Sequence, residues 1–265
     1  MDDFLLRTER HHYMAKEILK KRYPDSIVIW TAAIGSMNYG LASENSDCDT
    51  FSIVLPNYFD FISNTNLISF ETEIGDGKCV VKDFRLMMNL LRKTSPNSIE
   101  VFSSKYKVFE PEYKEIEKQF FSDSETMFYL IHANYKHMLN AIAGMCYQLH
   151  GRNMSEGKRY SHALHLDDMR QLFTKTREGD ILSFRHKAIN ELARIAKFCP
   201  ATEQENVFYR EETAKIASAL KAYSDKFEYT DAEKRVEYLA NYLINRLQFE
   251  VTKTYLEQNN FSYKE

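Results

Sequence analysis

The stretch AAIGSMNYGLASENSDCDTFSIVL, residues 32–55, combines a Gly-Ser pair with an Asp-x-Asp pair. The chain has only 8 glycines in 265 residues, and two of them lie in this stretch. Apolar and β-branched runs at residues 26–34 and 49–56 border the polar segment, and they predict two buried strands. The sequence therefore predicts a strand, a polar loop that turns the chain back, and a second strand.

The two carboxylates of this stretch suit a divalent cation. In Asp47-Cys48-Asp49, side-chain alternation along an extended chain places both carboxylates on one face, about 6 to 7 Å apart. Carboxylates so placed repel each other unless a cation lies between them. Mg²⁺ or Mn²⁺ prefers carboxylate oxygens together with substrate phosphates. We therefore expect Asp47 and Asp49 to be catalytic residues that bind the metal.

The Gly-Ser pair suits a phosphate. Gly35 is expected to end the first strand and to let the backbone approach a ligand closely. Ser36 offers a hydroxyl and a backbone N–H at an expected helix start, where it could be a plain N-cap, a phosphate contact or both. Ser46 is expected to be a turn residue or a further phosphate contact. Together with the metal, these groups are suited to bind a triphosphate.

The segments around this stretch predict a small mixed α/β unit. Apolar residues at helical spacing predict an amphipathic helix over residues 3–22. Residues 66–84 read as a β-hairpin, and Asp83 is expected to cap a following helix over 84–93. These elements and the two strands make up the first 110 residues.

Beyond about Glu112 the strand signals end and helical periodicity takes over. Long helices are expected over residues 123–149, 157–176 and 231–258. We therefore predict an α+β protein. A small mixed-sheet catalytic domain, residues 1–110, would be followed by an all-helical domain, residues 111–265.

The bulk composition narrows the possible partners and the compartment. With 35 basic and 38 acidic residues the formal net charge is −3, which gives no overall attraction to nucleic acid or to an anionic membrane. The four cysteines are widely spaced without a CxxC pair, which argues against a disulfide framework or a structural zinc site. No apolar stretch approaches the ~18 residues that span a bilayer. The sequence predicts a cytoplasmic protein without a membrane partner.

The motif GSMNYG…SDCD, with ten residues between Ser36 and Asp47, resembles the signature of the DNA polymerase β-like nucleotidyltransferases. Its form resembles one bacterial and phage branch of predicted nucleotidyltransferases, and residues 84–102 and 157–173 are similar to further stretches of that branch. The resemblance covers about residues 26–175. It implies a small mixed-sheet domain joined to a helical domain. It also implies transfer of a nucleoside monophosphate from an NTP to a hydroxyl, with Mg²⁺ or Mn²⁺ as cofactor and release of pyrophosphate.

The resemblance also implies a third carboxylate, from the strand that follows the hairpin turn. That strand reads KCVVK over residues 78–82 and contains no acid. The nearest candidate is Asp76 in the preceding turn, with Glu71 or Glu73 on the partner strand behind it. The sequence hypothesis gives Asp76 a catalytic role, as the residue that helps deprotonate the acceptor hydroxyl.

Two basic residues of the helical half are candidates for contact with the nucleotide. Lys158 and His162 lie near the start of the expected helix over 157–176, where basic groups oppose the helix dipole unless an anion is close. One interpretation is a solvated helix start. The other is a clamp on the triphosphate from across a cleft between the two domains, in which Lys158 neutralises the phosphates.

Three functions remain open at the level of sequence. The first is nucleotidyl transfer to an RNA end, a protein or a small molecule. The second is a catalytically weak nucleotide-binding or toxin-neutralising module of the same fold, which the missing strand acid favours. The third is polymerisation or RNA end repair, which the near-neutral charge disfavours.

Overall fold

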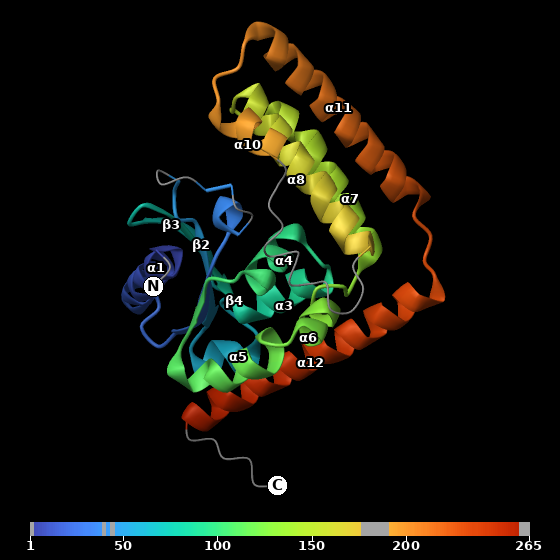
Figure 1. Cartoon of the computed structure of the whole chain (residues 1–265). Coiled ribbons are helices and arrows are strands. Elements are labelled where there is room, and N and C mark those ends of the chain that lie inside the picture. Colours follow the sequence, from blue (N-terminus) through green and yellow to red (C-terminus); the bar gives the residue numbers. More distant parts are fainter. Residues whose placement is uncertain (1–2, 39–40, 43–45, 176–190, 260–265) are drawn as a thin grey trace.

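A computed structural model describes residues 3–38, 41–42, 46–175 and 191–259 (Figure 1). The protein is α+β, as predicted: an N-terminal helix and a five-stranded mixed sheet precede a largely helical region. Helix α1 (Asp3–Arg22) leads into strand β1 (Ile27–Ala33), the short 3₁₀ helix η1 (Gly35–Met37) and strand β2 (Thr50–Leu55). The two strands predicted at the borders of the opening stretch are therefore confirmed, whereas residues 39–40 and 43–45 of the predicted loop lie outside the described residues.

The sheet is mixed because the hairpin that follows β2 joins it with one parallel pairing. The remaining strands are β3 (Ser69–Ile74), β4 (Gly77–Asp83) and β5 (Lys107–Phe109). The strand order is β3-β4-β2-β1-β5. Only β2 and β4 run parallel among these described strands; the other neighbouring pairs are antiparallel. The hairpin is confirmed, whereas the three-residue β5 was not predicted.

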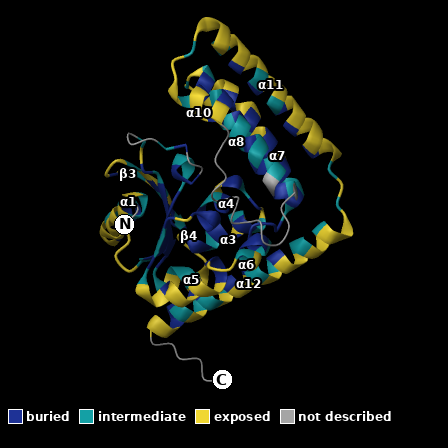
Figure 2. Cartoon of the chain, in the orientation of Figure 1, coloured by how far each residue is buried: buried dark blue, intermediate teal, exposed yellow. Residues whose placement is uncertain are grey.

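The two faces of the sheet pack against different helices. Helix α1 covers one face, where Ala15 and Leu19 pack with Val28 and Val54. On the other face Trp30 packs edge-on against Phe84 and Phe102. These two phenylalanines come from helices α3 (Phe84–Arg92) and α4 (Pro96–Ser103). Figure 2 shows how buried residues concentrate in the sheet and in α3 and α4.

Capping side chains define where these helices begin. Asp83 accepts from Arg85 N at 2.9 Å and caps α3 as predicted, and Ser95 accepts from Ser98 N and caps α4. Asn57 caps the short helix α2 (Tyr58–Ser63) in the same way. Each cap satisfies a backbone donor that the first turn of a helix leaves unpaired.

The helical region consists of short and long helices that pack on one another and on the helices next to the sheet. They are α5 (Lys114–Phe121), α6 (Ser124–Leu130), α7 (Tyr135–Gln148), α8 (Glu156–Lys175), α10 (Glu191–Phe198), α11 (Glu203–Lys226) and α12 (Asp231–Gln258), with 3₁₀ turns η2 (Pro111–Tyr113) and η3 (Leu149–Gly151). Helices α7, α8, α10 and α11 form one bundle, whereas α12 runs back beneath α3, α5 and α6 (Figure 1). The predicted helices over 157–176 and 231–258 are thus confirmed across the described residues.

The single helix predicted over residues 123–149 is wrong. The structure breaks it into α6 and α7, because Asn134 takes an extended conformation and its side chain accepts from His137 N to start a new helix. His132 lies in the break, fully buried, with Nδ1 2.6 Å from Phe128 O and its ring stacked on Phe173. Because His132 is buried among apolar residues, the helical spacing of apolar residues in the sequence continues across the break.

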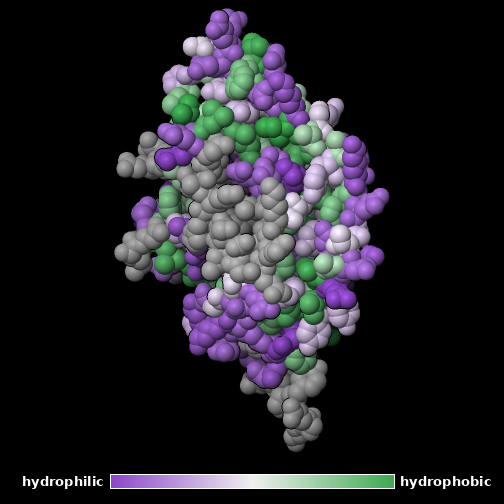
Figure 3. Space-filling view, turned by 45° about the vertical axis from the view of Figure 1, so that its right-hand side comes forward, coloured by the Kyte–Doolittle hydropathy of each residue, from purple (hydrophilic) through white to green (hydrophobic). Residues whose placement is uncertain are grey.

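No candidate for a membrane span is found among the described helices. None of them is both long enough and apolar enough to cross a bilayer. Apolar side chains do emerge at the far end of the helical bundle, where green residues lie among purple ones in the upper part of Figure 3. The exposed ones there include Leu192, Ile195, Phe198, Val207 and Phe208.

Two helical glycines give opposite expectations for stability. A Cβ at Gly157 would overlap the carbonyl oxygen of Ala196, because α8 and α10 pack there backbone to backbone. A Cβ at Gly144 would meet nothing within 4 Å. We expect Gly157→Ala to lower the free energy of unfolding by about 1–3 kcal/mol. Gly144→Ala, the matched control, should raise it by roughly 0.5–1 kcal/mol. Urea unfolding of both variants tests the packing of α10, and equal effects would contradict it.

Candidate functional site

The Gly-Ser turn, Gly35 and Ser36, ends strand β1 as predicted. Gly35 has φ +74°, a left-handed conformation that glycine adopts without steric cost. Asn38 closes the turn: its N–H donates to Gly35 O at 3.0 Å, and its side-chain amide donates to Ala33 O at 2.8 Å. The chain therefore leaves the sheet sharply and exposes the backbone of the turn on one side.

The Asp-x-Asp pair, Asp47 and Asp49, lies beside this turn. Ile34 N donates to Asp49 O at 2.9 Å, so Asp49 lies across from the residue that precedes Gly35. Asp47 is exposed, Asp49 is half-buried, and Cys48 between them is fully buried. The structure thus brings the Gly-Ser turn next to Asp49, and it leaves Asp47 exposed to solvent.

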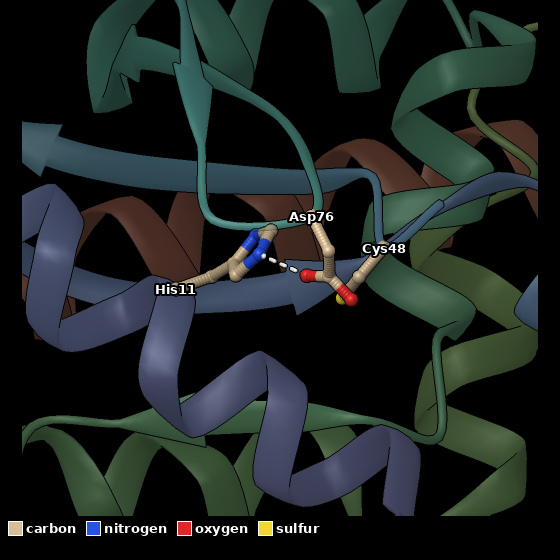
Figure 4. Close-up of side chains that lie close together, drawn as sticks. All are labelled: His11, Cys48 and Asp76. Carbon is tan, nitrogen blue, oxygen red and sulfur yellow. Dashed lines mark hydrogen bonds and ion pairs between the residues drawn. The ribbon is translucent and has the colours of Figure 1, made fainter. Parts of the chain in front are cut away.

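Asp76 is held by helix α1. It lies in the β3–β4 turn, where its carboxylate forms an ion pair with Arg7, and His11 Nε2 lies 3.1 Å from Oδ1 (Figure 4). Burial opposes ionisation of Asp76, but its hydrogen bonds with His11 and Arg7 outweigh burial and lower its pKa. The candidate third carboxylate is therefore engaged by two groups of α1, which the sequence did not identify.

Ser46 is also tied to α1 through its backbone. Arg7 donates to Ser46 O at 2.7 Å, so the same guanidinium joins the start of the Asp-x-Asp segment to Asp76. Ser46 is half-buried, and it does not line the cavity described below.

A lysine occupies the place next to Asp49 on the neighbouring strand. The parallel register pairs Thr50 with Cys79, which puts Asp49 beside Lys78, and Lys78 N donates to Asp49 Oδ1 at 3.1 Å. The Lys78 ammonium forms ion pairs with Glu71 at 2.9 Å and Glu73 at 3.7 Å. The two glutamates that the sequence offered as alternatives are thus paired with a cation at the sheet edge.

A cavity of about 200 Å³ opens between the Gly-Ser turn and the helical region. Its wall includes Gly35 and Ser36 from the turn and Glu100 from α4. The opposite wall comes from the helical region, and its polar residues are Arg152, Ser161, His162, His165 and Lys197. The structure therefore brings His162 to the same cavity as the Gly-Ser turn, whereas Asp47 and Asp49 lie beside the cavity rather than in its wall.

The helical wall of this cavity is cationic. Burial and, to a smaller extent, the nearby charges of Lys158, Lys197 and Arg152 together lower the pKa of His162 to about 4. Lys158 is close enough to act on His162 and Lys197, although it does not line the cavity. Lys197 donates to Leu41 O at 2.8 Å and so joins α10 to the segment that follows the turn.

Two further groups of the cavity were not identified from the sequence. Glu100 Oε2 accepts from Gly35 N at 3.2 Å, so the turn already holds an anionic oxygen. The Ser161 hydroxyl is buried in the wall and has no hydrogen-bond partner among the residues that the structure describes. Both residues lie within the two further stretches of resemblance, residues 84–102 and 157–173, but neither was singled out there as a site residue. Lys197, in α10, and Arg152, in the segment between η3 and α8, likewise lack a local signal. Tyr39 and Gly40 of the motif lie outside the described residues.

Two kinds of metal site have to be distinguished. The carboxylates of Asp47 and Asp49 are hard oxygen donors, which suit Mg²⁺ when substrate phosphates complete its coordination. One group of three different donor types lies close together within the described part of the chain: His11, Cys48 and Asp76. A thiol and an imidazole are poor ligands for Mg²⁺, so this group is not the magnesium site.

Comparison of the chain with protein-family models and with curated proteins finds no match. The functional assignment therefore depends on the motifs and on the geometry described above.

The electrostatics of the cavity predict how His162 responds to an anion. In the free protein its pKa lies near 4, and inorganic triphosphate in the cavity should raise it, because the anion offsets the neighbouring positive charges. The pKa of His162 is measured by NMR from its ring C–H resonances between about pH 3.5 and pH 8, a range that includes both the lowered and the ordinary pKa of histidine. His162→Gln assigns the signal. A pKa that triphosphate leaves unchanged would contradict an anion site.

The same shift predicts how stability depends on pH. The unfolded chain takes up a proton at His162 near pH 6.5, whereas the folded chain resists protonation down to about pH 4. The free energy of unfolding should therefore fall as the pH drops through this window. Urea unfolding at several pH values should show a shallower decline for His162→Gln than for the original chain. An identical slope would mean that His162 is not protected from protonation.

Proposed function

We propose that this chain is a divalent-metal-dependent nucleotidyltransferase. It would transfer a nucleoside monophosphate from an NTP to an acceptor hydroxyl and release pyrophosphate. One observation carries the proposal: the Gly-Ser turn lies directly beside the Asp-x-Asp pair and also forms one wall of a cavity with a cationic opposite wall. A triphosphate with a bound metal ion needs these two environments side by side.

The residues divide between phosphates and metal. Gly35 and Ser36 bind phosphate oxygens through backbone and hydroxyl groups, and His162 and Lys197 supply polar and cationic contacts from the helical side. Asp47 and Asp49 hold Mg²⁺ or Mn²⁺. When bound, such an ion neutralises charge on the phosphates and favours departure of pyrophosphate. The chain also positions the nucleotide between the sheet and the helical region.

Two contacts of the free structure have to change when a nucleotide binds. Glu100 occupies the N–H of Gly35, so a phosphate oxygen replaces a carboxylate oxygen on the same donor. Lys197 donates to Leu41 O, and its ammonium is held near the cavity in a half-buried setting. Ser161 adds a buried hydroxyl that gains a partner on binding. At Gly35 and at Lys197, a phosphate oxygen of the ligand would replace a protein oxygen as the hydrogen-bond acceptor.

A second function, nucleotide binding without transfer, is favoured by the strand next to Asp49. Lys78 stands there instead of an acid, and Asp76 is engaged by Arg7 and His11. Activation of an acceptor hydroxyl by Asp76 requires that the carboxylate exchange these partners for the hydroxyl. If it does not, the chain binds nucleotide as a module that could neutralise a toxin or act as a sensor.

The proposed function is tested with labelled NTPs, Mg²⁺ and the full chain, with RNA, protein and small hydroxyl compounds offered as acceptors. Asp47→Asn with Asp49→Asn should reduce pyrophosphate release at least about 100-fold, because the metal loses both ligands. Asp225→Asn, an exposed aspartate of α11 paired with Lys221, is the matched control and should retain activity. Nucleotide binding without pyrophosphate release would support the binding module. Absence of nucleotide binding would contradict both functions.

The contribution of the helical wall is tested at Lys197. We expect Lys197→Met to weaken triphosphate binding about 10-fold or more, because a charge-assisted contact to phosphate is lost while the aliphatic stem remains. Lys221→Met on the exposed face of α11 is the control and should leave affinity unchanged. Calorimetric titration with a non-hydrolysable NTP measures both. Equal affinities of the two variants for the nucleotide would show that Lys197 does not contact the triphosphate.

A further inference from the structure

Three side chains of different chemistry meet between α1 and the sheet, and we refer to them as the His-Cys-Asp cluster. His11 comes from α1, Cys48 from the segment before β2 and Asp76 from the β3–β4 turn (Figure 4). Each offers one ligand atom, and these atoms all lie within 4.8 Å of one another. His11 and Cys48 are fully buried, whereas the Asp76 side chain is 46% exposed. The cluster is therefore enclosed on two sides and open to solvent on the third.

The spacing of the donors fits a small tetrahedral ion. His11 Nε2 and Asp76 Oδ1 lie 3.1 Å apart. Nitrogen and oxygen ligands that each lie about 2.0–2.2 Å from a tetrahedral Zn²⁺ are separated by roughly 3.3–3.5 Å. The Cys48 sulfur lies within 4.8 Å of one ring nitrogen of His11 and one carboxylate oxygen of Asp76, so small side-chain adjustments suffice to complete three ligands. Solvent reaches the cluster through Asp76, which leaves a fourth position for water.

The remaining nitrogen of His11 is already anchored. Nδ1 lies 3.1 Å from the hydroxyl of Thr50, which also lies 3.5 Å from the carbonyl oxygen of Lys78. In the free chain the hydrogen bond to Asp76 places the ring proton on Nε2, and Nδ1 accepts from the Thr50 hydroxyl. With a metal on Nε2 the ring proton would lie on Nδ1 and donate to Thr50, whose hydroxyl can donate to Lys78 O. Histidines that bind metals are oriented in this way by a partner on the other ring nitrogen. Burial lowers the pKa of His11, which favours the neutral ring that a metal requires.

The charges around Cys48 are balanced in favour of a cation. The carboxylates of Asp76, Asp49 and Asp3 and the guanidinium of Arg7 lie close enough to Cys48 to act on it electrostatically. Three carboxylates thus act on this thiol against one guanidinium. Arg7 binds Asp76 through Oδ2 and leaves Oδ1 facing His11. A carboxylate that bridges a metal and a basic group is a usual arrangement around metal ligands.

We propose that His11, Cys48 and Asp76 bind a thiophilic divalent cation of the Zn²⁺ class, with water as the fourth ligand. On binding, Cys48 would lose its thiol proton to solvent and form a metal–sulfur bond, while the neutral His11 ring would release its Nε2 proton to solvent and take one up on Nδ1, so that Nε2 binds the metal. Sulfur and nitrogen donors select Zn²⁺ over Mg²⁺, so this site differs from the one proposed at the Asp-x-Asp pair. Asp76 is then a metal ligand rather than the residue that activates the acceptor hydroxyl.

The three ligands come from three separate segments of the chain, so a bound ion would also have a structural role. The ion joins α1 to the segment that contains Asp47 and Asp49 and to the turn that precedes β4. Arg7 makes a parallel connection, from α1 to Ser46 O and Asp76. Cys48 lies between the two carboxylates of the Asp-x-Asp pair, so a metal on its sulfur fixes the backbone from which both carboxylates project.

The first experiment identifies the ligands by spectroscopy. The full chain is stripped with a chelator, loaded with Co²⁺ and dialysed, and metal content is measured by mass spectrometry. We expect about one Co²⁺ per chain and a near-ultraviolet thiolate-to-metal charge-transfer band. The band should be lost in Cys48→Ser and retained in Cys79→Ser and Cys199→Ser, which alter a buried and an exposed cysteine outside the cluster. A band that persists in Cys48→Ser, or a chain that retains no Co²⁺, would overturn the proposal.

The second experiment does not depend on the cysteine variant. His11→Gln and Asp76→Asn should each weaken Zn²⁺ binding at least about 10-fold in competition with a chromophoric chelator. Zn²⁺ should raise the melting temperature of the original chain and leave that of both variants unchanged, and excess Mg²⁺ should not compete. Equal affinity of the original chain and both variants for Zn²⁺ would show adventitious binding and refute the site. Because neither Asp47 nor Asp49 is a ligand here, failure of this test leaves the proposed nucleotide site standing.

Discussion

The pairing between the end of β1 and the start of β2 governs the rest of the structure. Ala33 lies opposite Thr50, and Ile34 N donates to Asp49 O, so the chain that leaves the sheet at Gly35 has to return at Asp49. A left-handed conformation at Gly35 permits the sharp exit. This one closure sets the Gly-Ser turn beside the Asp-x-Asp pair and turns Cys48 toward α1. Both proposed sites share the same short length of backbone.

Much of the fold could be predicted because its signals are local. Strand alternation, the Asp83 cap and the apolar faces of α1, α8 and α12 are all visible within short windows of sequence. The three-residue β5 is too short to show alternation, and only its pairing with β1 defines it. The break between α6 and α7 was missed because His132 is buried against Phe173, which lies far along the chain. Tertiary packing decided both cases.

The candidate site was likewise predictable from the sequence only where its signals are local. The spacing of the Gly-Ser and Asp-x-Asp motifs predicted their proximity, since both flank one strand pair. Glu100, Ser161 and Lys197 reach the cavity only through the packing of α4, α8 and α10, and the sequence motifs do not single out these three residues. The position of Lys78 beside Asp49 depends on the parallel register of β2 and β4, and a shift of one residue would have presented Cys79 instead.

Helix α12 has a consequence for how the protein is made. It packs on α3, α5 and α6, and the Tyr255 hydroxyl donates to Pro56 O at 2.7 Å, close to the end of β2. The core that supports the sheet is therefore closed by a segment about 200 positions later, so the chain has to hold an incomplete core throughout much of its synthesis. A ribosome-bound chain that ends before residue 231 leaves the apolar faces of α3 and α6 uncovered. Apolar surface exposed in this way promotes aggregation, and α12 covers it once residues 231–258 have been synthesised.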